Sequence, residues 1–143
     1  MKIIYIILTI TFTLVSCSEN DENLSEPQEV SLIGQWQLIE VFLPSGNGTD
    51  SWNTIDNGYT YNFNANTTFT SDRFSECDNG FFIYKDNLLT LDYSCEGFTT
   101  GIESPEGTFI ENISFDGGNM ILVPTYKDCT EGCGWKFRKV SGE

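Results

Sequence analysis

The stretch Tyr59-Thr60-Tyr61-Asn62-Phe63-Asn64 alternates aromatic and polar side chains at every step. Successive side chains of a β-strand point to opposite faces of a sheet, so this alternation predicts an antiparallel strand with one buried face and one solvated face. The next residues, Asn64-Ala65-Asn66-Thr67, predict a turn into a partner strand over residues 68–71. The stretch therefore indicates β-structure built from short, half-buried strands.

The rest of the chain repeats this two-residue period between Gly-, Asn- and Asp-containing segments, and no convincing amphipathic helix is present. We predict further strands over residues 34–43, 81–84, 88–93, 109–115, 120–126 and 135–140. Most of them are joined by tight turns. Because a meander of eight strands can remove its edges by closing, the sequence predicts an all-β fold, an eight-stranded antiparallel up-and-down barrel.

The N-terminus reads as an export signal. Lys2 precedes an apolar run from Ile3 to Val15, which is typical of a signal peptide and too short for a membrane-spanning helix. The run ends in Leu14-Val15-Ser16-Cys17, which resembles the bacterial lipobox. We expect residues 1–16 to be a lipoprotein signal peptide and Cys17 to carry the lipid anchor. The alternative is an ordinary secretory signal followed by a structural cysteine.

Residues 17–30 carry five acidic side chains and no basic one, which is the composition of a flexible tether. We expect this tether to join the anchor to a single domain over residues 31–143. The acids directly after Cys17 resemble surface-export signals of some Gram-negative lineages, and Ser18 is similar to what outer-membrane sorting tolerates. The expected location is the outer membrane, on its surface-exposed or its periplasmic face.

Charge and composition exclude several functions. The chain has 21 acidic and 7 basic residues and no His, which argues against a nucleic-acid partner and removes the usual imidazole base. No G-x-S-x-G, H-E-x-x-H or phosphate-binding Gly loop is present. Paired carboxylates such as Asp72 and Glu76 are expected by chance in so acidic a chain. We therefore expect no catalytic residue, no cofactor and no metal site.

Four cysteines follow Cys17, in a compartment that permits disulfides. If the hairpin over residues 81–93 turns about Asp86, Cys77 lies across from Cys95, just beyond the paired strands. Cys129 and Cys133 bracket a short turn before the last strand. We predict the disulfides Cys77–Cys95 and Cys129–Cys133. The alternative, a four-cysteine zinc site, lacks the paired C-x2-C spacing of such sites.

Two motifs at the ends of the domain resemble a known family. The first strand contains Gly34-Gln35-Trp36, a G-x-W motif, and the last reads Trp135-Lys136-Phe137-Arg138-Lys139-Val140. The pair resembles the lipocalin signature, and residues 31–140 are similar to the lipocalin-like lipoproteins of Gram-negative bacteria. The resemblance implies that Trp36 plugs the closed end of the barrel and that Arg138 packs over its ring. Because Arg138 alternates with Trp135 and Phe137, this contact needs an inward face or a bulge, and Lys136 is the alternative cation.

Aromatic side chains are the remaining functional resource. Inward-facing rings line an apolar ligand cavity in some small barrels and fill the interior in others, and both alternatives stay open here. Trp52 is expected in a loop at the barrel mouth, where it would contact a ligand or partner or cover the core. The candidate ligand-binding residues are Trp52, Tyr59, Tyr61, Phe63, Phe69 and Phe81.

These observations lead to two hypotheses about function. The first is an outer-membrane-anchored, lipocalin-like lipoprotein that is a non-catalytic binding module for a small apolar ligand. The second is a structural or interaction lipoprotein with a solid core, acting through its loops on another envelope protein. In both, a lipid anchor joins the protein to the membrane.

Overall fold

The computed structural model describes residues 31–44, 51–126 and 132–141. These residues form nine strands: β1 (Gly34–Phe42), β2 (Trp52–Thr54), β3 (Thr60–Phe63), β4 (Thr68–Ser71), β5 (Asn79–Lys85), β6 (Leu88–Tyr93), β7 (Thr108–Asp116), β8 (Asn119–Pro124) and β9 (Gly134–Ser141). In this part of the chain, no helix is long and apolar enough to cross a membrane.

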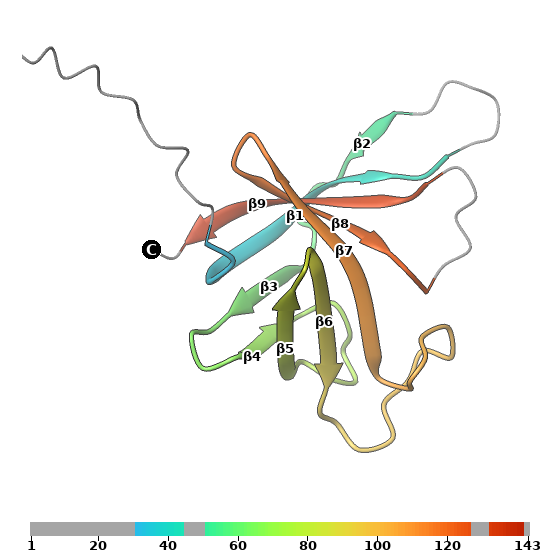
Figure 1. The fold of residues 1–143 in the computed structure, drawn as a ribbon. Helices are drawn as coiled ribbons and strands as arrows, with labels where there is room; N and C mark the ends of the chain where they lie inside the picture. Colours follow the sequence, from blue (N-terminus) through green and yellow to red (C-terminus); the bar gives the residue numbers. More distant parts are fainter. Residues whose placement is uncertain (1–30, 45–50, 127–131, 142–143) are drawn as a thin grey trace, which may run out of the picture.

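Eight of the nine strands close into an antiparallel barrel (Figure 1). β1 pairs with β3, each strand from β3 to β8 pairs with the next, and β9 returns to pair with β1. Closure satisfies the backbone groups that an open sheet would leave at its edges. The predicted all-β, eight-stranded up-and-down barrel is therefore confirmed.

The ninth strand, β2, extends the barrel wall beside β1. Residues 34–37 of β1 pair with β3, residues 40–42 pair with β2, and β9 runs along the other side of β1. A Cβ at Gly58, between β2 and β3, would lie 2.2 Å from the backbone oxygen of Leu38. Only glycine permits this close approach. The sequence analysis places Trp52 in a loop and predicts no strand here, so β2, which begins at Trp52, corrects that prediction.

The turns divide the barrel into two ends. The closed end carries the start of β1 and the hairpin turns that follow β3, β5 and β7, and the mouth carries the longer β4–β5 and β6–β7 loops (Figure 1). Trp36, near the start of β1, is fully buried, and its indole Nε1 donates a hydrogen bond of 2.8 Å to the backbone oxygen of Leu32. Gly34 has a φ of 121°, which L side chains rarely adopt, so the G-x-W motif needs its glycine.

The β5–β6 hairpin has a register one residue away from the predicted one. Asp86 and Asn87 have φ angles of 52° and 60°, so they form a two-residue turn rather than a turn centred on Asp86. Phe82 therefore pairs with Leu91, and Phe81 pairs with Asp92. A one-residue change in register moves every side chain to the other face of the sheet. Phe82 consequently points into the core, and Phe81 points outward.

Candidate functional site

Aromatic rings pack against one another in the interior of the barrel. Three of the predicted ligand-binding residues, Tyr61, Phe63 and Phe69, are at most 1% exposed. Their rings contact one another, with centroids 5.5 Å apart for Tyr61 and Phe63 and 6.3 Å apart for Phe63 and Phe69. Tyr59 packs edge-on against Tyr61 at 5.5 Å. These four residues come together, and their contacts are with other core side chains. Ligand binding by them stays a prediction.

A buried charged cluster lies among these rings. Arg73, from the β4–β5 loop, donates hydrogen bonds of 3.0 Å to the Tyr61 hydroxyl and 3.1 Å to the Tyr126 hydroxyl. The same guanidinium lies 3.6 Å from the Glu111 carboxylate of β7, which is 1% exposed. Tyr126 in turn donates a hydrogen bond of 2.7 Å to Glu111. The cluster joins a loop and two strands across the interior.

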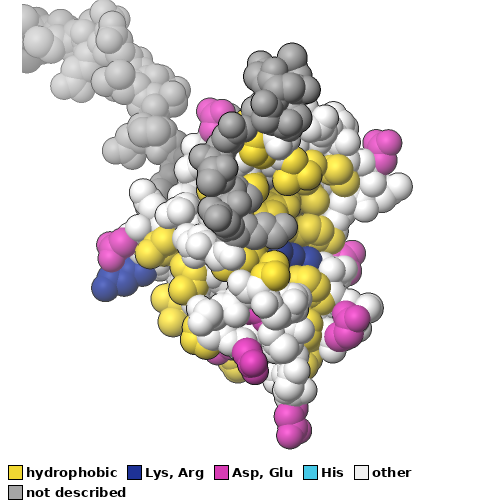
Figure 2. Space-filling view, turned by 90° about the vertical axis from the view of Figure 1, so that its right-hand side faces the viewer, with side chains coloured by type: hydrophobic (Ala, Val, Ile, Leu, Met, Phe, Trp, Pro, Cys, Tyr) yellow, Lys and Arg dark blue, Asp and Glu magenta, His cyan; other side chains and the backbone are white. Residues whose placement is uncertain are grey.

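Aromatic faces surround the same guanidinium. Its central carbon lies 4.8 Å from the ring centroid of Phe74, 5.0 Å from that of Phe109 and 5.8 Å from that of Trp135. A cation within about 6 Å of an aromatic face is attracted by the ring quadrupole. Figure 2 shows basic side-chain atoms recessed among hydrophobic side chains near the centre of one face of the molecule. The arrangement holds a buried positive charge with an ion pair, hydrogen bonds and ring contacts.

Burial raises the pKa of three tyrosines in or beside this cluster: Tyr59, Tyr93 and Tyr126. Burial raises the pKa of Tyr59 and of Tyr126 well above the ordinary tyrosine value, because a phenolate would lose its hydration there. Burial likewise raises the pKa of Tyr93, which packs against Phe69. A neutral phenol both accepts and donates hydrogen bonds, as Tyr126 does between Arg73 and Glu111.

The cation over Trp36 differs from the one that the family resemblance implies. Lys139 pairs with Trp36 across β1 and β9, and its ammonium lies 5.6 Å from the ring centroid of Trp36. Arg138 pairs with Gln37 and points outward, so the expectation for Arg138 is wrong. Lys139 takes this place for two reasons. Alternation along β9 puts Phe137 and Lys139 on the inner face. A register irregularity between Gln35 and Trp36 then brings Lys139 opposite Trp36.

Trp52 lies on the outer wall of the barrel. It stands in the short strand β2, and its ring centroid is 5.7 Å from that of Phe42. The Lys136 ammonium lies 4.4 Å from the centroid of the indole and also pairs with the Glu40 carboxylate. A Cβ at Gly134 would lie 2.9 Å from the tip of the indole. The absent side chain at Gly134 therefore makes room for Trp52.

Two grooves lie on this part of the outer wall. An apolar groove of about 270 Å³ is lined by Phe42, Trp52, Ile121, Val123, Gly132, Cys133 and Gly134. A polar groove of about 430 Å³ is lined by Gln37, Leu38, Ile39, Glu40, Thr54, Ile55, Asp56, Asn57 and Arg138. The ion pair between Glu40 and Lys136 separates the two grooves. Glu40 lines the polar groove, and Lys136 lies over Trp52, which lines the apolar groove. Of the residues predicted to bind a ligand, Trp52 is the one that lines a groove described here.

Phe81 does not belong to the interior. It is 55% exposed on the outer face of β5, as the observed hairpin register requires. Its neighbours across the strands are Thr68 of β4 and Asp92 of β6. The prediction that Phe81 lines the barrel with Tyr59 and Phe63 is therefore wrong, and Phe82 takes that place with its ring centroid 5.0 Å from that of Phe63.

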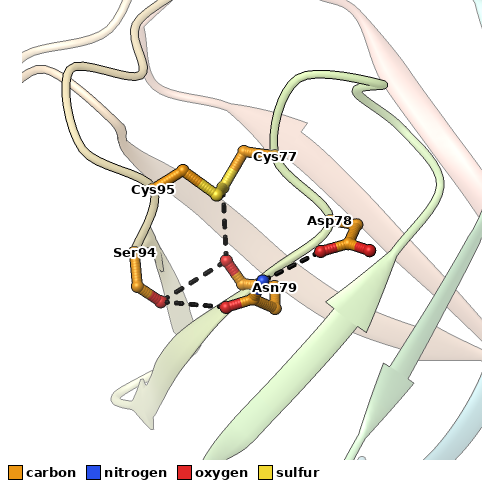
Figure 3. The surroundings of a disulfide bond; sticks show 5 residues. All are labelled: Cys77, Asp78, Asn79, Ser94 and Cys95. Carbon is orange, nitrogen blue, oxygen red and sulfur yellow. Dashed lines mark hydrogen bonds between the residues drawn. A yellow bond between two sulfur atoms is a disulfide. The ribbon is translucent and has the colours of Figure 1, made fainter.

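A disulfide joins the two mouth loops (Figure 3). It links Cys77 to Cys95, as predicted, and its Cys77 sulfur lies 3.5 Å from the backbone oxygen of Asn79. Ser94 donates from its hydroxyl to the same oxygen at 3.5 Å. Cys133 is also disulfide-bonded. Cys129 and the expected lipid-bearing Cys17 lie outside the described residues, so the pairing of Cys129 with Cys133 stays a prediction.

Glu103 organises the β6–β7 loop at the mouth. Its buried carboxylate accepts hydrogen bonds from the backbone nitrogens of Thr100 at 2.9 Å, Gly107 at 3.0 Å and Ile102 at 3.2 Å. It also accepts one from the Thr100 hydroxyl. Burial alone would raise the pKa of Glu103, but these hydrogen bonds outweigh it and lower the pKa. Within the described residues, no group of three or more His, Cys, Asp or Glu could hold a metal ion.

The residue that sequence reasoning missed is Arg73. It lies in a loop, where no alternation reports which way a side chain points. One signal was available: Arg73 is among only 7 basic residues in the chain and is followed by Phe74 between two strands of the expected barrel. A basic and an aromatic residue together in such a loop are consistent with insertion into the barrel mouth.

Comparisons with known proteins add information about the fold. No family model and no curated protein matches the chain. A solved structure of an uncharacterized protein from Bacteroides eggerthii is similar to it, with a TM-score of 0.51 and 18% sequence identity over 76% of this chain and 99% of that chain. At this identity the likeness concerns the fold alone.

Proposed function

We propose that the protein is an exported, outer-membrane-anchored lipoprotein that acts as a non-catalytic interaction module through the outside of its barrel. The observation that carries the proposal is the occupied interior. Tyr61, Phe63 and Phe69 are buried against one another, and Arg73 with its ring neighbours lies beside Tyr61. Interiors packed in this way leave ligand recognition to the surface. The lipid anchor in this proposal rests on the lipobox-like residues that end in Cys17. We also propose that the protein is related to the lipocalin-like lipoproteins, on the motifs around Trp36 and Arg138.

The paired grooves on the outer wall support an interaction site. The apolar groove beside Trp52 offers a place for an aliphatic or aromatic group, and the polar groove offers amide, carboxylate and guanidinium groups for hydrogen bonds. An apolar centre beside a polar rim is the usual anatomy of a protein interface. We assign the site to an apolar side chain of another envelope protein.

The second candidate function is binding of a small apolar ligand in the same apolar groove. The lining favours it, because Phe42, Trp52, Ile121 and Val123 supply apolar contacts there. Ligand sites are predominantly apolar with a few polar groups at fixed positions. The ligand would still be a small apolar molecule, as the sequence predicts, but it would bind on the outer wall of the barrel and not in the interior.

An in-cell crosslinking experiment tests the first function. A photoreactive amino acid is placed at Val123 in the groove and, as a matched control, at Val140, which is 44% exposed away from the groove. We expect one discrete crosslinked envelope protein from position 123 and none from position 140. The interaction proposal fails if position 123 yields no product or the same products as position 140. The mass of the mature N-terminal peptide tests acylation of Cys17 in the same cells.

Titration with 1-anilinonaphthalene-8-sulfonate, an aromatic probe, tests the second function. Saturable binding that is lost in Val123→Glu and kept in Val140→Glu supports a ligand site in the apolar groove. Binding that survives Val123→Glu but is changed by Phe63→Leu places the probe inside the barrel and contradicts the filled interior. Absence of saturable binding removes the small-ligand candidate.

A further inference from the structure

The β5–β6 hairpin ends in a group of exposed apolar side chains. Ile83 is 66% exposed, Tyr84 45% and Leu88 40%, and Lys85 lies between them. We call residues 83–88 the hairpin tip. Single exposed apolar residues are ordinary, but these three lie at the end of one hairpin, with Ile83 and Leu88 on its outer face and Tyr84 on its inner face. In Figure 2, hydrophobic side chains also gather on the left of the molecule, beside a basic one.

The hairpin tip is exposed because it projects past its neighbour. β4 pairs with β5 only from Asn79 to Phe81, whereas β6 pairs with β5 as far as Lys85. In the described sheet, residues 83–85 therefore have a partner strand on one side. Tyr84, which alternation places on the inner face with Phe82, extends beyond the core and is exposed as well.

The hairpin tip lies at the end of the barrel where the expected tether begins. Gly34, at the start of β1, pairs with Phe63, at the end of β3. The turn after β3 reaches β5, because the backbone nitrogen of Phe82 donates to the oxygen of Thr67 at 2.9 Å. The start of β1, this turn and the hairpin tip thus follow one another along the closed end. The described residues begin at Ser31, at this same end.

Charge separates this end of the barrel from the mouth. The two mouth loops carry exposed acidic side chains and no exposed basic one: Asp72, Glu76, Asp78, Glu96 and Glu106. At the closed end, Lys85, Arg138 and Lys139 accompany Asp86 and Asp116. An anionic membrane surface therefore repels these two mouth loops more strongly than it repels the described residues of the closed end.

We propose that the closed end of the barrel rests on the bilayer that holds the anchor, with the hairpin tip in the interfacial region. The inference builds on the proposed lipid anchor at Cys17. Tyr and Lys suit this place, because each has an apolar body and a polar end that stays in water. The backbone of residues 17–30 spans at most about 50 Å, which lets the closed end reach the membrane. The mouth and its acidic loops then face away from the bilayer.

The test uses the full, acylated protein in vesicles of phosphatidylcholine and phosphatidylglycerol with brominated acyl chains. Bromine quenches indole emission at short range. The variant Tyr84→Trp reports on the hairpin tip, and Glu106→Trp is the matched control in a mouth loop. Emission of the unsubstituted protein is subtracted, since it contains Trp36, Trp52 and Trp135. If Tyr84→Trp does not fold, Ile83→Trp replaces it at a more exposed position.

We expect bromine to lower the added emission about twofold in Tyr84→Trp and to leave it unchanged in Glu106→Trp. Equal or absent quenching in the two variants of anchored protein overturns the inference and leaves the proposed function standing. The inference is also overturned if the emission of the added tryptophan changes with protein concentration and not with bromine. A second copy of the protein, and not the bilayer, then covers the hairpin tip. Absence of an acyl group on Cys17 with no vesicle association refutes both proposals.

Discussion

The guanidinium of Arg73 and the carboxylate of Glu111 form an ion pair 3.6 Å apart inside the barrel, with 12% and 1% of their side chains exposed. A buried charge is costly unless a partner and hydrogen bonds compensate it, and here Tyr61 and Tyr126 supply those bonds. The pair fixes the β4–β5 loop against β7. It therefore holds the side chain of a loop residue against the aromatic rings of the barrel interior.

Replacing Arg73 with Met should destabilise the fold strongly. Glu111 would remain buried without its cationic partner, and breaking such a pair costs about 3–5 kcal/mol. Urea unfolding followed by far-UV circular dichroism measures the change in the free energy of unfolding. The companion variant Arg73→Met/Glu111→Leu removes both charges and should recover most of the lost stability. Equal destabilisation by the single and double variants would show that the ion pair is not the cause.

Phe82 and Phe81 should respond differently to truncation. Phe82 is 7% exposed and packs against Phe63, so Phe82→Ala should lower the free energy of unfolding by about 3 kcal/mol. Phe81 is 55% exposed, so Phe81→Ala should change it by less than about 1 kcal/mol. Thermal unfolding of the two variants compares them directly. A larger loss of stability in Phe81→Ala than in Phe82→Ala would support the predicted register, in which Phe81 faces inward.

Lys139 should affect the environment of Trp36, and Arg138 should not. Loss of the cation over the indole in Lys139→Met is expected to cost about 0.5–1 kcal/mol and to shift the near-UV circular dichroism of tryptophan. Arg138→Met is the matched control on the outer face of the same strand. A larger effect of Arg138→Met on the tryptophan signal would reinstate the contact that the lipocalin signature implies.

Glu103 should make the fold sensitive to acid. Its pKa is lowered in the folded state from the ordinary value of 4.5, so its contribution to stability is complete above that pH and is lost as the pH falls below it. Glu103→Gln should cost about 1–2 kcal/mol at pH 7 and should reduce the loss of stability on acidification. Urea midpoints of both proteins at pH 7 and pH 4 provide the comparison. Parallel pH dependences would mean that Glu103 stays protonated or exposed.

The disulfide between Cys77 and Cys95 should stabilise the barrel by restricting the unfolded chain. With a sequence separation of 18, its removal in Cys77→Ala/Cys95→Ala should cost about 3 kcal/mol. The melting temperature in the absence of reductant is the readout. Since the linked loops also carry Arg73, the variant should lose protection of the β4–β5 loop in hydrogen exchange before the rest of the fold. An unchanged melting temperature would contradict this role.

Alternation of side chains was enough to predict the barrel. Tyr61 and Phe63 are separated by one polar residue, and both are buried, as a half-solvated strand requires. The Cys77–Cys95 pairing was also predicted, although the hairpin register behind it was one residue out. Both cysteines lie in loops beyond the ends of β5 and β6, so a one-residue change in the register of these strands still leaves the two cysteines close together. The same difference inverted the faces assigned to Phe81 and Phe82.

The interior cluster could not be predicted in the same way. Arg73 enters the barrel from a loop, and its contacts with Tyr61, Tyr126 and Glu111 join residues distant in sequence. Likewise, the cation over Trp36 depends on an irregularity in the pairing of β1 with β9, which pattern alone does not locate. Period-two patterns report which face a strand buries. They do not report how a loop side chain is used.

A crystal structure of the acylated protein purified from its own cells would show directly what occupies the inside of the barrel. We predict continuous density for the rings of Tyr61, Phe63 and Phe69 and for Arg73 bonded to Glu111, with no other molecule among them. Density for a bound molecule between these rings, with Arg73 displaced from Glu111, would instead show that the barrel interior is the binding site.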